Sequence, residues 1–244
     1  MEKIEKLKQI IDESNNIVVF TGAGVSTDSG LKDFRSKDGL YNKSLVAEYM
    51  LSDVCFYDET EEFYKYYKEN FNCLNIKPND THKFIKKLED IGKLKTVITQ
   101  NIDGLHTKAG SKNVYEIHGT IYKNHCLKCH KEYGPEKVFN EKNIPICDCG
   151  GLIKPDVVLY GESLPEKEYQ ESIKAITKSD LLLVLGTSLT VFPANSMIDY
   201  FNGKYLVIIN NDKTPYDSRA YLVINDNLAK ISKTLMEKIK WKKK

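Results

Sequence analysis

The sequence predicts an α/β fold in which a doubly wound parallel sheet carries a smaller second unit. The first observation is a series of short, β-branched apolar runs, which are typical of strands buried on both faces of a sheet. These runs are "IVVF" (17–20), "TVIT" (96–99), "DVVLY" (156–160), "LLLVLG" (181–186) and "YLVIIN" (205–210). A chain of 244 residues with 41% hydrophobic content can bury such a core as one large domain or as a domain with an insertion.

The second observation is that helical patterns lie between several of these runs, as in "THKFIKKLEDIG" (81–92) and "EKEYQESIKAITKS" (166–179). Such alternation favours a parallel sheet covered by helices. The third observation is that residues 36–78, rich in Tyr, Phe and acidic side chains, and residues 121–153, cysteine-bearing and loop-like, break the alternation. We expect these two segments to form a small domain. The large domain would then comprise residues 1–35, 79–120 and 154–244.

The charge balance argues against several classes of partner. The chain has 36 basic and 34 acidic side chains, which does not suggest nucleic-acid binding. It has no apolar stretch of about eighteen residues, and its N-terminal segment mixes charges with Ile and Leu at helical spacing. The sequence therefore predicts neither a membrane span nor a secretory signal. We expect a cytoplasmic location and a monomer, with the basic end "KIKWKKK" (238–244) as the frayed end of a helix.

The first apolar run leads directly into the glycine-containing stretch "TGAGVST" (21–27). Glycines at the end of a buried strand let backbone amides approach a phosphate, so a diphosphate ligand is indicated. The dinucleotide fingerprint is incomplete, because Thr27 stands where a third glycine is usual. A tight structural turn is an equally good interpretation of Gly22 and Gly24 alone. No Gly-Lys-Ser/Thr sequence occurs, which excludes a Walker-type phosphate loop.

Four cysteines form two close pairs, "CLKC" and "CDC". Thiolates so spaced can close a tetrahedral zinc site that has no open position for water, so we expect a structural metal. The ligands would be Cys126, Cys129, Cys147 and Cys149. Free thiols or disulfides are the alternative, and His125 and His130 flank the first pair as possible substitute ligands. Cys55 and Cys73 lie outside the array and are interpreted as small hydrophobic residues.

One histidine has the setting of a catalytic group. His118 stands at the tip of the strand-like run "VYEIHGT" (114–120) with a glycine behind it, although a lone histidine can also be structural. The stretch "TQNIDGLH" (99–106) supplies Gln100, Asn101 and Asp103 at another strand end. Asn and Asp side chains recognise an amide well, so a ligand carrying an amide group is indicated.

These motifs together resemble those of the sirtuins. "GAGVSTDSGLKDFR", "TQNIDGLH", "IHG", the paired cysteines, "KPDVVLYGE" and "GTSL" occur in the order found in that family, over nearly the whole chain. Sirtuins are NAD-dependent protein lysine deacylases with a Rossmann-like large domain and a small domain made of a helical insertion and a zinc ribbon. The resemblance implies NAD, one structural Zn²⁺ and acyl-lysine proteins or peptides as substrates.

The resemblance also implies roles for individual residues. His118 would be the general base, and Asn101, also counted as catalytic, would hold the nicotinamide amide together with Asp103. Cofactor contacts would come from Ala23, Gly24, Ser26, Thr27, Phe34, Arg35, Gln100, Asn101, Ile102, Asp103, His118, Gly186, Thr187, Ser188, Asn210 and Asp226. The acyl-lysine tunnel would be lined by Val157, Val158, Tyr160 and Gly161, with this segment pairing with the substrate backbone as an added strand.

The implied reaction moves the acyl group from lysine to ADP-ribose, with release of nicotinamide and O-acetyl-ADP-ribose. Two other functions use the same features: an NAD glycohydrolase or ADP-ribosyltransferase, and a non-catalytic NAD-sensing module that binds through its zinc ribbon. Intact His118, Asn101 and Asp103 argue against the module, and retention of "VVLYGE" (157–162) argues against the glycohydrolase.

The chain departs from the common family pattern in three places, and from that of some specialised members in a fourth. Lys32 stands where proline is common, Tyr160 stands where phenylalanine is common, and the second cysteine pair is one residue tighter. The stretch "EEFYKYYKENFN" (61–72) offers tyrosines but not the arginine with which succinyl-specific and malonyl-specific members bind a carboxylate. We therefore expect uncharged acyl groups such as acetyl to be preferred.

Overall fold

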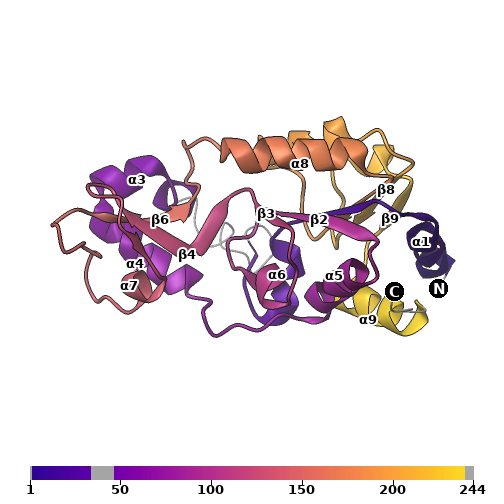
Figure 1. The fold of residues 1–244 in the computed structure, drawn as a ribbon, viewed down its shortest axis with the longest axis horizontal. Coiled ribbons are helices and arrows are strands. Elements are labelled where there is room, and N and C mark those ends of the chain that lie inside the picture. The colour runs from indigo at the N-terminus through magenta and orange to yellow at the C-terminus, as the bar shows by residue number, and fades with distance from the viewer. Residues whose placement is uncertain (1, 34–46, 240–244) are drawn as a thin grey trace.

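The computed structural model describes residues 2–33 and 47–239. Figure 1 shows two lobes along the longest axis, a large one built on a parallel sheet and a small one that contains α3, α4, α7 and β6. The first and last helices, α1 (Glu2–Glu13) and α9 (Leu228–Lys238), pack together at the far end of the large lobe. None of the helices within the described parts is long and apolar enough to cross a membrane.

The large sheet has six strands in the order β3-β2-β1-β7-β8-β9, and all neighbouring strands are parallel. The strands are β1 (Ile17–Thr21), β2 (Leu94–Thr99), β3 (Val114–Glu116), β7 (Leu181–Leu185), β8 (Tyr205–Ile209) and β9 (Leu222–Ile224). Numbered within this sheet the order is 3-2-1-4-5-6, that of a Rossmann-like doubly wound sheet. Strand order reverses between β1 and β7, so a ligand crevice is expected at their carboxyl ends.

Both faces of the sheet are buried, which explains the continuous apolar strands. Val19 and Leu183 point into the core shared with α1, α5 (Asp80–Asp90) and α9. Their chain neighbours Val18 and Leu182 point into the opposite core, against α8 (Glu166–Lys178) and the 3₁₀ helix η4 (Ala194–Tyr200). Figure 1 shows α8 above the sheet and α5 and α9 below it. The predicted fold class is therefore confirmed, and the helices predicted at 81–92 and 166–179 correspond to α5 and α8.

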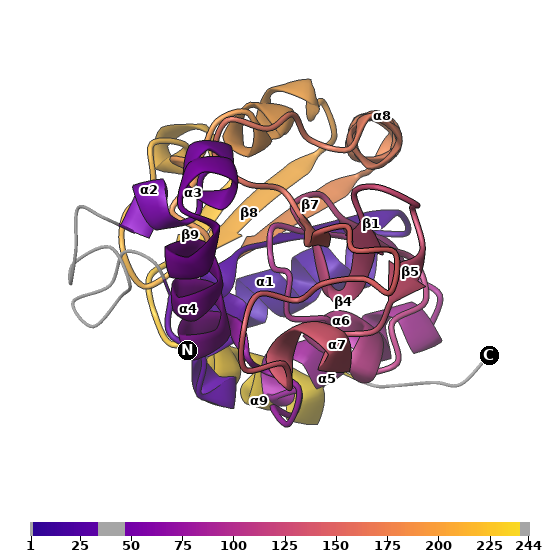
Figure 2. The same ribbon diagram turned by 90° about the vertical axis from the view of Figure 1, so that its left-hand side faces the viewer.

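The small lobe has an antiparallel sheet and a core that includes the aromatic side chains of Phe56, Phe63, Tyr64 and Tyr67. Its strands are β4 (Gly119–Cys126), β5 (Glu132–Tyr133) and β6 (Ile153–Val157), in the order β5-β4-β6. Its helices are α2 (Ala47–Met50), α3 (Asp53–Asp58), α4 (Thr60–Phe71) and α7 (Glu136–Phe139). Figure 2 shows α2, α3 and α4 on one side and β4, β5 and α7 on the other. On α4, Phe63, Tyr67 and Phe71 stack at i, i+4 spacing, with ring centroids 5.5–5.6 Å apart.

The remaining elements are short and lie in the connections. They are the 3₁₀ helices η1 (Ala23–Val25), η2 (Thr27–Ser29) and η5 (Asp217–Arg219), and the single-turn helix α6 (Leu105–Lys108). The elements η1 and η2 follow β1 directly, so the glycine-containing stretch turns as soon as the strand ends.

The prediction of a buried strand over residues 156–160 is wrong. The strand β6 ends at Val157 and pairs antiparallel with β4 in the small sheet. The carboxylate of Glu162 accepts from the Leu159 N–H (2.9 Å), and the Tyr160 N–H donates to the Leu51 carbonyl (2.9 Å), so the backbone leaves the strand. The prediction that residues 121–153 are loop-like is only partly correct, because β4 runs over eight residues from Gly119 to Cys126. The domain boundaries themselves stay a prediction.

Candidate active site

A cavity of about 340 Å³ lies where the strand order of the large sheet reverses and extends to the small lobe. Its walls come from the turns after β1, β2, β7 and β8 and from α4 and the segment after β6. Among the predicted site residues, the cavity is lined by Ala23, Gly24, Ser26, Gln100, Asn101, Ile102, Asp103, His118, Val157, Val158, Tyr160, Gly161, Gly186, Thr187, Ser188 and Asn210. Most of the predicted set is thus brought together.

The turns after β1 and β7 cross at van der Waals distance. The Gly24 N–H donates to the Gly186 carbonyl (2.8 Å), and a Cβ on Gly24 would lie 2.8 Å from the Gly186 Cα. Gly186 itself has φ +59°, and a Cβ there would lie 2.6 Å from the Val25 nitrogen. Side chains larger than hydrogen are therefore excluded where the two turns meet. The backbone of Gly24 and Gly186 is left to line the cavity there.

Three side chains at the cavity floor form a directed hydrogen-bond chain. The Asn101 amide Nδ2 donates to Ser26 Oγ (3.1 Å), which donates to Asp103 Oδ2 (2.7 Å). The other carboxylate oxygen, Oδ1, accepts from the Leu105 N–H (2.8 Å). Burial raises the pKa of Asp103, and the Ser26 and Leu105 hydrogen bonds oppose that rise. The amide, hydroxyl and carboxyl groups are thus fixed in orientation, as recognition of a ligand amide requires.

His118 lies between β3 and β4 with its side chain half-buried in the cavity wall. Its Nδ1 is 2.9 Å from the Gln100 carbonyl oxygen. A carbonyl only accepts, so Nδ1 carries the proton and Nε2 keeps its lone pair. Burial lowers the pKa of His118, which favours the neutral imidazole. The next residue, Gly119, has φ +78°, and a Cβ there would lie 2.0 Å from the Asp156 carbonyl oxygen, so only glycine fits.

Gln100 links two turns of the large sheet. Its side-chain Nε2 donates to Thr187 Oγ1 (3.0 Å), and its backbone N–H donates to the Thr21 carbonyl (3.0 Å). Asn210, at the end of β8, lines the same cavity, and its amide donates to the Asp212 carbonyl (2.9 Å). Hydroxyl and amide groups therefore line the crevice on both sides of the glycine turns, a donor set that suits the sugar and phosphate groups of a dinucleotide.

The segment after β6 forms another wall and has little freedom to pair with a further strand. Its backbone donors are occupied, because the Val158 N–H bonds the His118 carbonyl (2.9 Å) and those of Leu159 and Tyr160 bond Glu162 and Leu51. Glu162 also pairs with the buried ammonium of Lys154 (3.1 Å). A substrate strand beside this segment would have to use its carbonyl groups or the residues that follow it.

The sequence analysis missed the part of the cavity wall that comes from the small lobe. Tyr67 lines the cavity with 1% of its surface exposed, and its hydroxyl has no hydrogen-bond partner among the described residues. Leaving a buried hydroxyl unpaired costs about 1–3 kcal/mol. The other missed residues include Leu51, Asn70, Phe71, Cys73, Phe192 and Asp212. The i, i+4 spacing of Tyr67 and Phe71 could have indicated a buried helix face, but not that this face meets a ligand cavity.

Some predicted residues do not reach the cavity or lie outside the described residues. Thr27 does not line it, and its hydroxyl donates to the Gly24 carbonyl (3.0 Å). Asp226 is exposed, accepts from the Asn227 N–H (2.8 Å) and pairs with Lys230 (3.5 Å), away from the lining. Phe34 and Arg35 lie outside the described residues.

The four predicted cysteines form one cluster in the small lobe, with all four sulfur atoms within 4.8 Å of one another. Cys126 and Cys149 lie 3.5 Å apart, and Cys129 and Cys147 lie 3.6 Å apart. Zinc–sulfur bonds near 2.3 Å place the sulfurs of a tetrahedral site about 3.8 Å apart, so the cluster fits zinc. None of the six cysteines forms a disulfide, and His125 pairs with Asp156 instead of the cluster.

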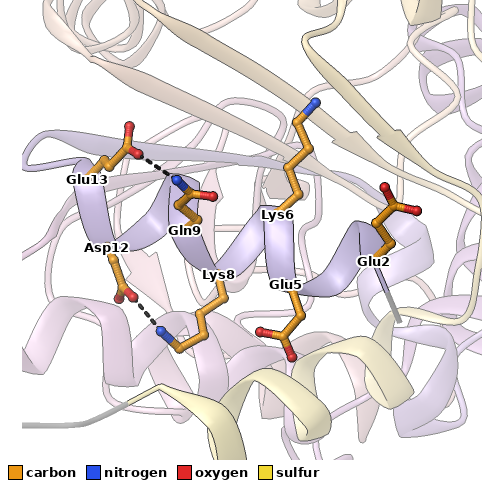
Figure 3. Close-up of a pocket in the computed structure, with 7 residues that line it drawn as sticks. All are labelled: Glu2, Glu5, Lys6, Lys8, Gln9, Asp12 and Glu13. Atoms are coloured by element: carbon orange, nitrogen blue, oxygen red, sulfur yellow. Dashed lines mark hydrogen bonds and ion pairs between the residues drawn. The ribbon is translucent and has the colours of Figure 1, made fainter.

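Another hollow lies on the outside of α1 and is lined only by that helix (Figure 3). Its side chains point in different directions, and two pairs satisfy each other, Lys8 with Asp12 (2.5 Å) and Gln9 with Glu13 (3.2 Å). Because its polar groups do not converge, this hollow is a solvated helix face.

Comparisons with known proteins agree with this geometry. A model of the Sir2 family matches residues 22–193. The chain is 50% identical over 242 residues to an NAD-dependent protein deacetylase of Clostridium acetobutylicum, covering 97% of this chain and 99% of the relative. It is 46% identical to an NAD-dependent protein deacetylase of Staphylococcus aureus, covering 96% of this chain and 98% of the relative.

Solved structures are similar over the same length. A Sir2 protein bound to acetylated peptide is 38% identical with a TM-score of 0.87, covering 96% of this chain and 98% of that one. A Sir2 protein with a deacetylated peptide and 3'-O-acetyl ADP ribose is 39% identical with a TM-score of 0.91 and the same coverage. The family match spans most of the large sheet's ligand crevice and the whole cysteine cluster, and this chain therefore belongs to the Sir2 family.

Proposed function

We propose that this protein is an NAD-dependent protein lysine deacetylase. The observation that carries the proposal is a single cavity that joins the glycine turns, the Asn101–Ser26–Asp103 chain and the unprotonated Nε2 of His118. It lies at the reversal of strand order, where doubly wound sheets bind nucleotides. The names of the relatives and the peptide-bound Sir2 structures support the same activity.

Different residues of the large lobe contact different parts of the cofactor. Ala23, Gly24 and Ser26 hold the diphosphate, and Asn101 and Asp103 hold the nicotinamide amide. Thr27, Phe34, Arg35, Gln100, Ile102, Gly186, Thr187, Ser188, Asn210 and Asp226 complete the predicted set, although Thr27 and Asp226 act only if the turns that carry them shift toward the cavity. Bound NAD supplies a nicotinamide–ribose bond whose cleavage drives transfer of the acetyl group to ADP-ribose.

His118 is the one group in this arrangement placed to move a proton. Its Nδ1–H is held by the Gln100 carbonyl, so Nε2 is the atom that accepts a proton from a ribose hydroxyl. The lowered pKa keeps that nitrogen unprotonated at neutral pH. The same side chain closes the cavity wall and thereby helps to exclude water, which favours acyl transfer over hydrolysis.

The substrate lysine enters between the two lobes. Val157, Val158, Tyr160 and Gly161 line its path and give it apolar walls. The four cysteines hold the structural zinc, which has no open position and supplies no chemistry of its own. Classification as a group-transfer enzyme, a cytoplasmic location and a monomeric state belong to the proposal as expectations.

Product analysis tests this function directly. With NAD and an acetyl-lysine peptide, the protein should release free-lysine peptide, nicotinamide and O-acetyl-ADP-ribose in equal amounts, measured by mass spectrometry. ADP-ribose formed without deacetylated peptide would instead identify an NAD glycohydrolase. NAD binding with no product of any kind would identify the sensing module.

A further inference from the structure

We propose that Lys154 is a positioning residue for the acyl-lysine peptide. Its buried ammonium, together with the Glu162 carboxylate, holds the cavity wall formed by residues 157–162 in the shape to which the peptide binds. The inference rests on the proposed deacetylase function and adds to it a residue that does not itself line the cavity.

The first step is that the ammonium of Lys154 is buried and bonds only to the wall and the strand that leads into it. Only 9% of the Lys154 side chain is exposed. Its Nζ donates to Glu162 Oε2 (3.1 Å), to the Val157 carbonyl (3.2 Å) and to the Pro155 carbonyl (3.4 Å). Within residues 2–33 and 47–239 it has no other hydrogen-bond acceptor, so all three donors of the ammonium are used locally. Val157 and Glu162 line the cavity, so Lys154 acts on the cavity through them.

The second step is that the Lys154–Glu162 pair fixes the wall backbone at two points. The ammonium binds the Val157 carbonyl directly. The Glu162 oxygen that accepts from Lys154 also accepts from the Leu159 N–H (2.9 Å). Without the ammonium, the Val157 carbonyl loses this bond and the Glu162 carboxylate loses the charge that holds it over Leu159.

The third step is that these two points lie at the end of the wall nearest the catalytic base. Between them, the Val158 N–H donates to the His118 carbonyl (2.9 Å). The other end of the wall is held independently of Lys154, because the Tyr160 N–H donates to the Leu51 carbonyl and the Asp53 N–H donates to the Tyr160 carbonyl (both 2.9 Å). Loss of the ammonium should therefore shift the wall next to His118 and leave its far end in place.

The fourth step is that a buried ion pair is a poor source of stability. Two charges lose their hydration on burial, and their mutual attraction roughly offsets that loss, whereas removal of one partner leaves an uncompensated charge. The effect of Lys154 must therefore be measured beside that of Glu162 and of the variant that lacks both charges. The pair of Lys174 and Glu171 on α8 is a suitable comparison, because 60% and 40% of these side chains are exposed and neither lines the cavity.

The test measures peptide binding and cofactor binding separately. Fluorescence anisotropy with a labelled acetyl-lysine peptide gives the peptide Kd without turnover, and steady-state assays give the KM for peptide and the KM for NAD. The variants are Lys154→Met, Glu162→Gln and the double variant that carries both. Lys174→Met is the matched control, because it removes a lysine from an exposed ion pair. Urea unfolding shows which variants are folded.

We expect Lys154→Met and Glu162→Gln each to raise the peptide Kd and KM by about tenfold while the KM for NAD stays within about twofold of the native value. The double variant should bind the peptide no more weakly than either single variant, because the two residues act as one unit. Lys174→Met should match the native chain in all three quantities.

A native peptide Kd in the folded variants overturns the inference, and if only one single variant folds, its peptide Kd decides. A rise in the KM for NAD as large as that for the peptide also overturns it, since this marks a general loss of structure, as does failure of both single variants to fold. Native turnover with unchanged variants leaves the deacetylase function standing. A native chain that binds the peptide but forms no deacetylated product loses that function, while the peptide Kd of the variants still decides the role of Lys154.

Discussion

The two lobes hold their functional groups in different ways. In the large lobe, apolar strands such as β1 and β7 are buried on both faces. Their parallel pairing positions the glycine turns that follow them at the cavity. In the small lobe, a three-stranded antiparallel sheet and a mixed aliphatic and aromatic core accompany a cluster of four cysteines. The large lobe therefore owes its geometry to a sheet buried on both faces, whereas the small lobe combines a hydrophobic core with a four-cysteine cluster that fits zinc.

This contrast assigns separate tasks to the two lobes. The large lobe supplies Asn101, Asp103 and His118, whose positions follow from the ends of β2 and β3. The small lobe contributes Tyr67, Asn70 and Phe71 of α4 to the cavity wall. Substitutions in the large lobe should abolish catalytic activity, while substitutions in the small lobe should change the stability of the protein and its choice of substrate.

The largest expected effect comes from removing the metal from the small lobe. The protein should contain about one zinc per chain, and Cys129→Ser should release it, because structural zinc contributes about 10 kcal/mol to folding of its site. Metal analysis and hydrogen exchange would show loss of zinc and of protection in β4 and β6, while β1 and β7 stay protected. A zinc-free Cys129→Ser protein with native exchange in β4 would remove the contrast between the lobes.

A substitution at the crossing of the two glycine turns tests the large lobe. Gly186→Ala adds a left-handed alanine and a clash with the Val25 nitrogen, so it should cost about 2–5 kcal/mol in unfolding free energy. Gly92→Ala is the matched control, since φ is +77° there but nothing lies within 4 Å of the added Cβ. It should cost about 1–2 kcal/mol. Equal losses in urea unfolding would mean that the turns are not tightly packed.

The third largest effect is expected on the choice between acyl groups, which depends on the residues that line the cavity. Acetyl-lysine should be processed at least about tenfold more efficiently than succinyl-lysine, a difference of about 1.4 kcal/mol. The reason is that the described lining has no arginine and that Lys68 is bound to backbone carbonyls. The measurement is kcat/KM on matched peptides. Equal values that become unequal in Lys32→Ala would show that Lys32 supplies the missing charge.

The smallest expected effect is the response to pH near neutrality. The pKa of His118 lies below its usual value of about 6.5, so the base is unprotonated above that pH and kcat/KM should be flat from pH 7 upward. As pH falls through the lowered pKa, the base is protonated and activity falls about tenfold per unit.

A second group near the site needs a control in this measurement. Burial raises the pKa of Glu116, two residues before His118, to about 7. Glu116→Gln should therefore leave the acidic fall in place. A midpoint above 6.5 that persists in Glu116→Gln would contradict the lowered pKa of His118.

The sequence predicted the large lobe better than the small one, for physical reasons. Continuous apolar runs such as residues 181–186 are typical of strands buried on both faces, and four of the predicted runs correspond to β1, β2, β7 and β8. Residues 156–160 have the same composition but leave their strand early, because Glu162 captures a backbone donor three residues before it. That turn is a local one between Leu159 and Glu162, which the apolar composition of residues 156–160 does not indicate.

The same limit applies to the candidate site. His118 and Asn101 stand next to strand ends and could be predicted, whereas Tyr67 is one tyrosine among three in residues 61–72. Only packing of α4 against β6 shows that the hydroxyl of Tyr64 is satisfied and that of Tyr67 is not. Asp226 shows the opposite error, since a residue near a strand end points to solvent and pairs with Lys230.

The most direct test of the central claim is the His118→Ala variant, measured for NAD binding and for turnover of an acetyl-lysine peptide in the same preparation. If the large lobe binds the cofactor through its turns and uses His118 only as the base, the variant should bind NAD while kcat/KM for deacetylation falls by at least about 100-fold. Native turnover by a folded, NAD-binding His118→Ala protein would contradict the account.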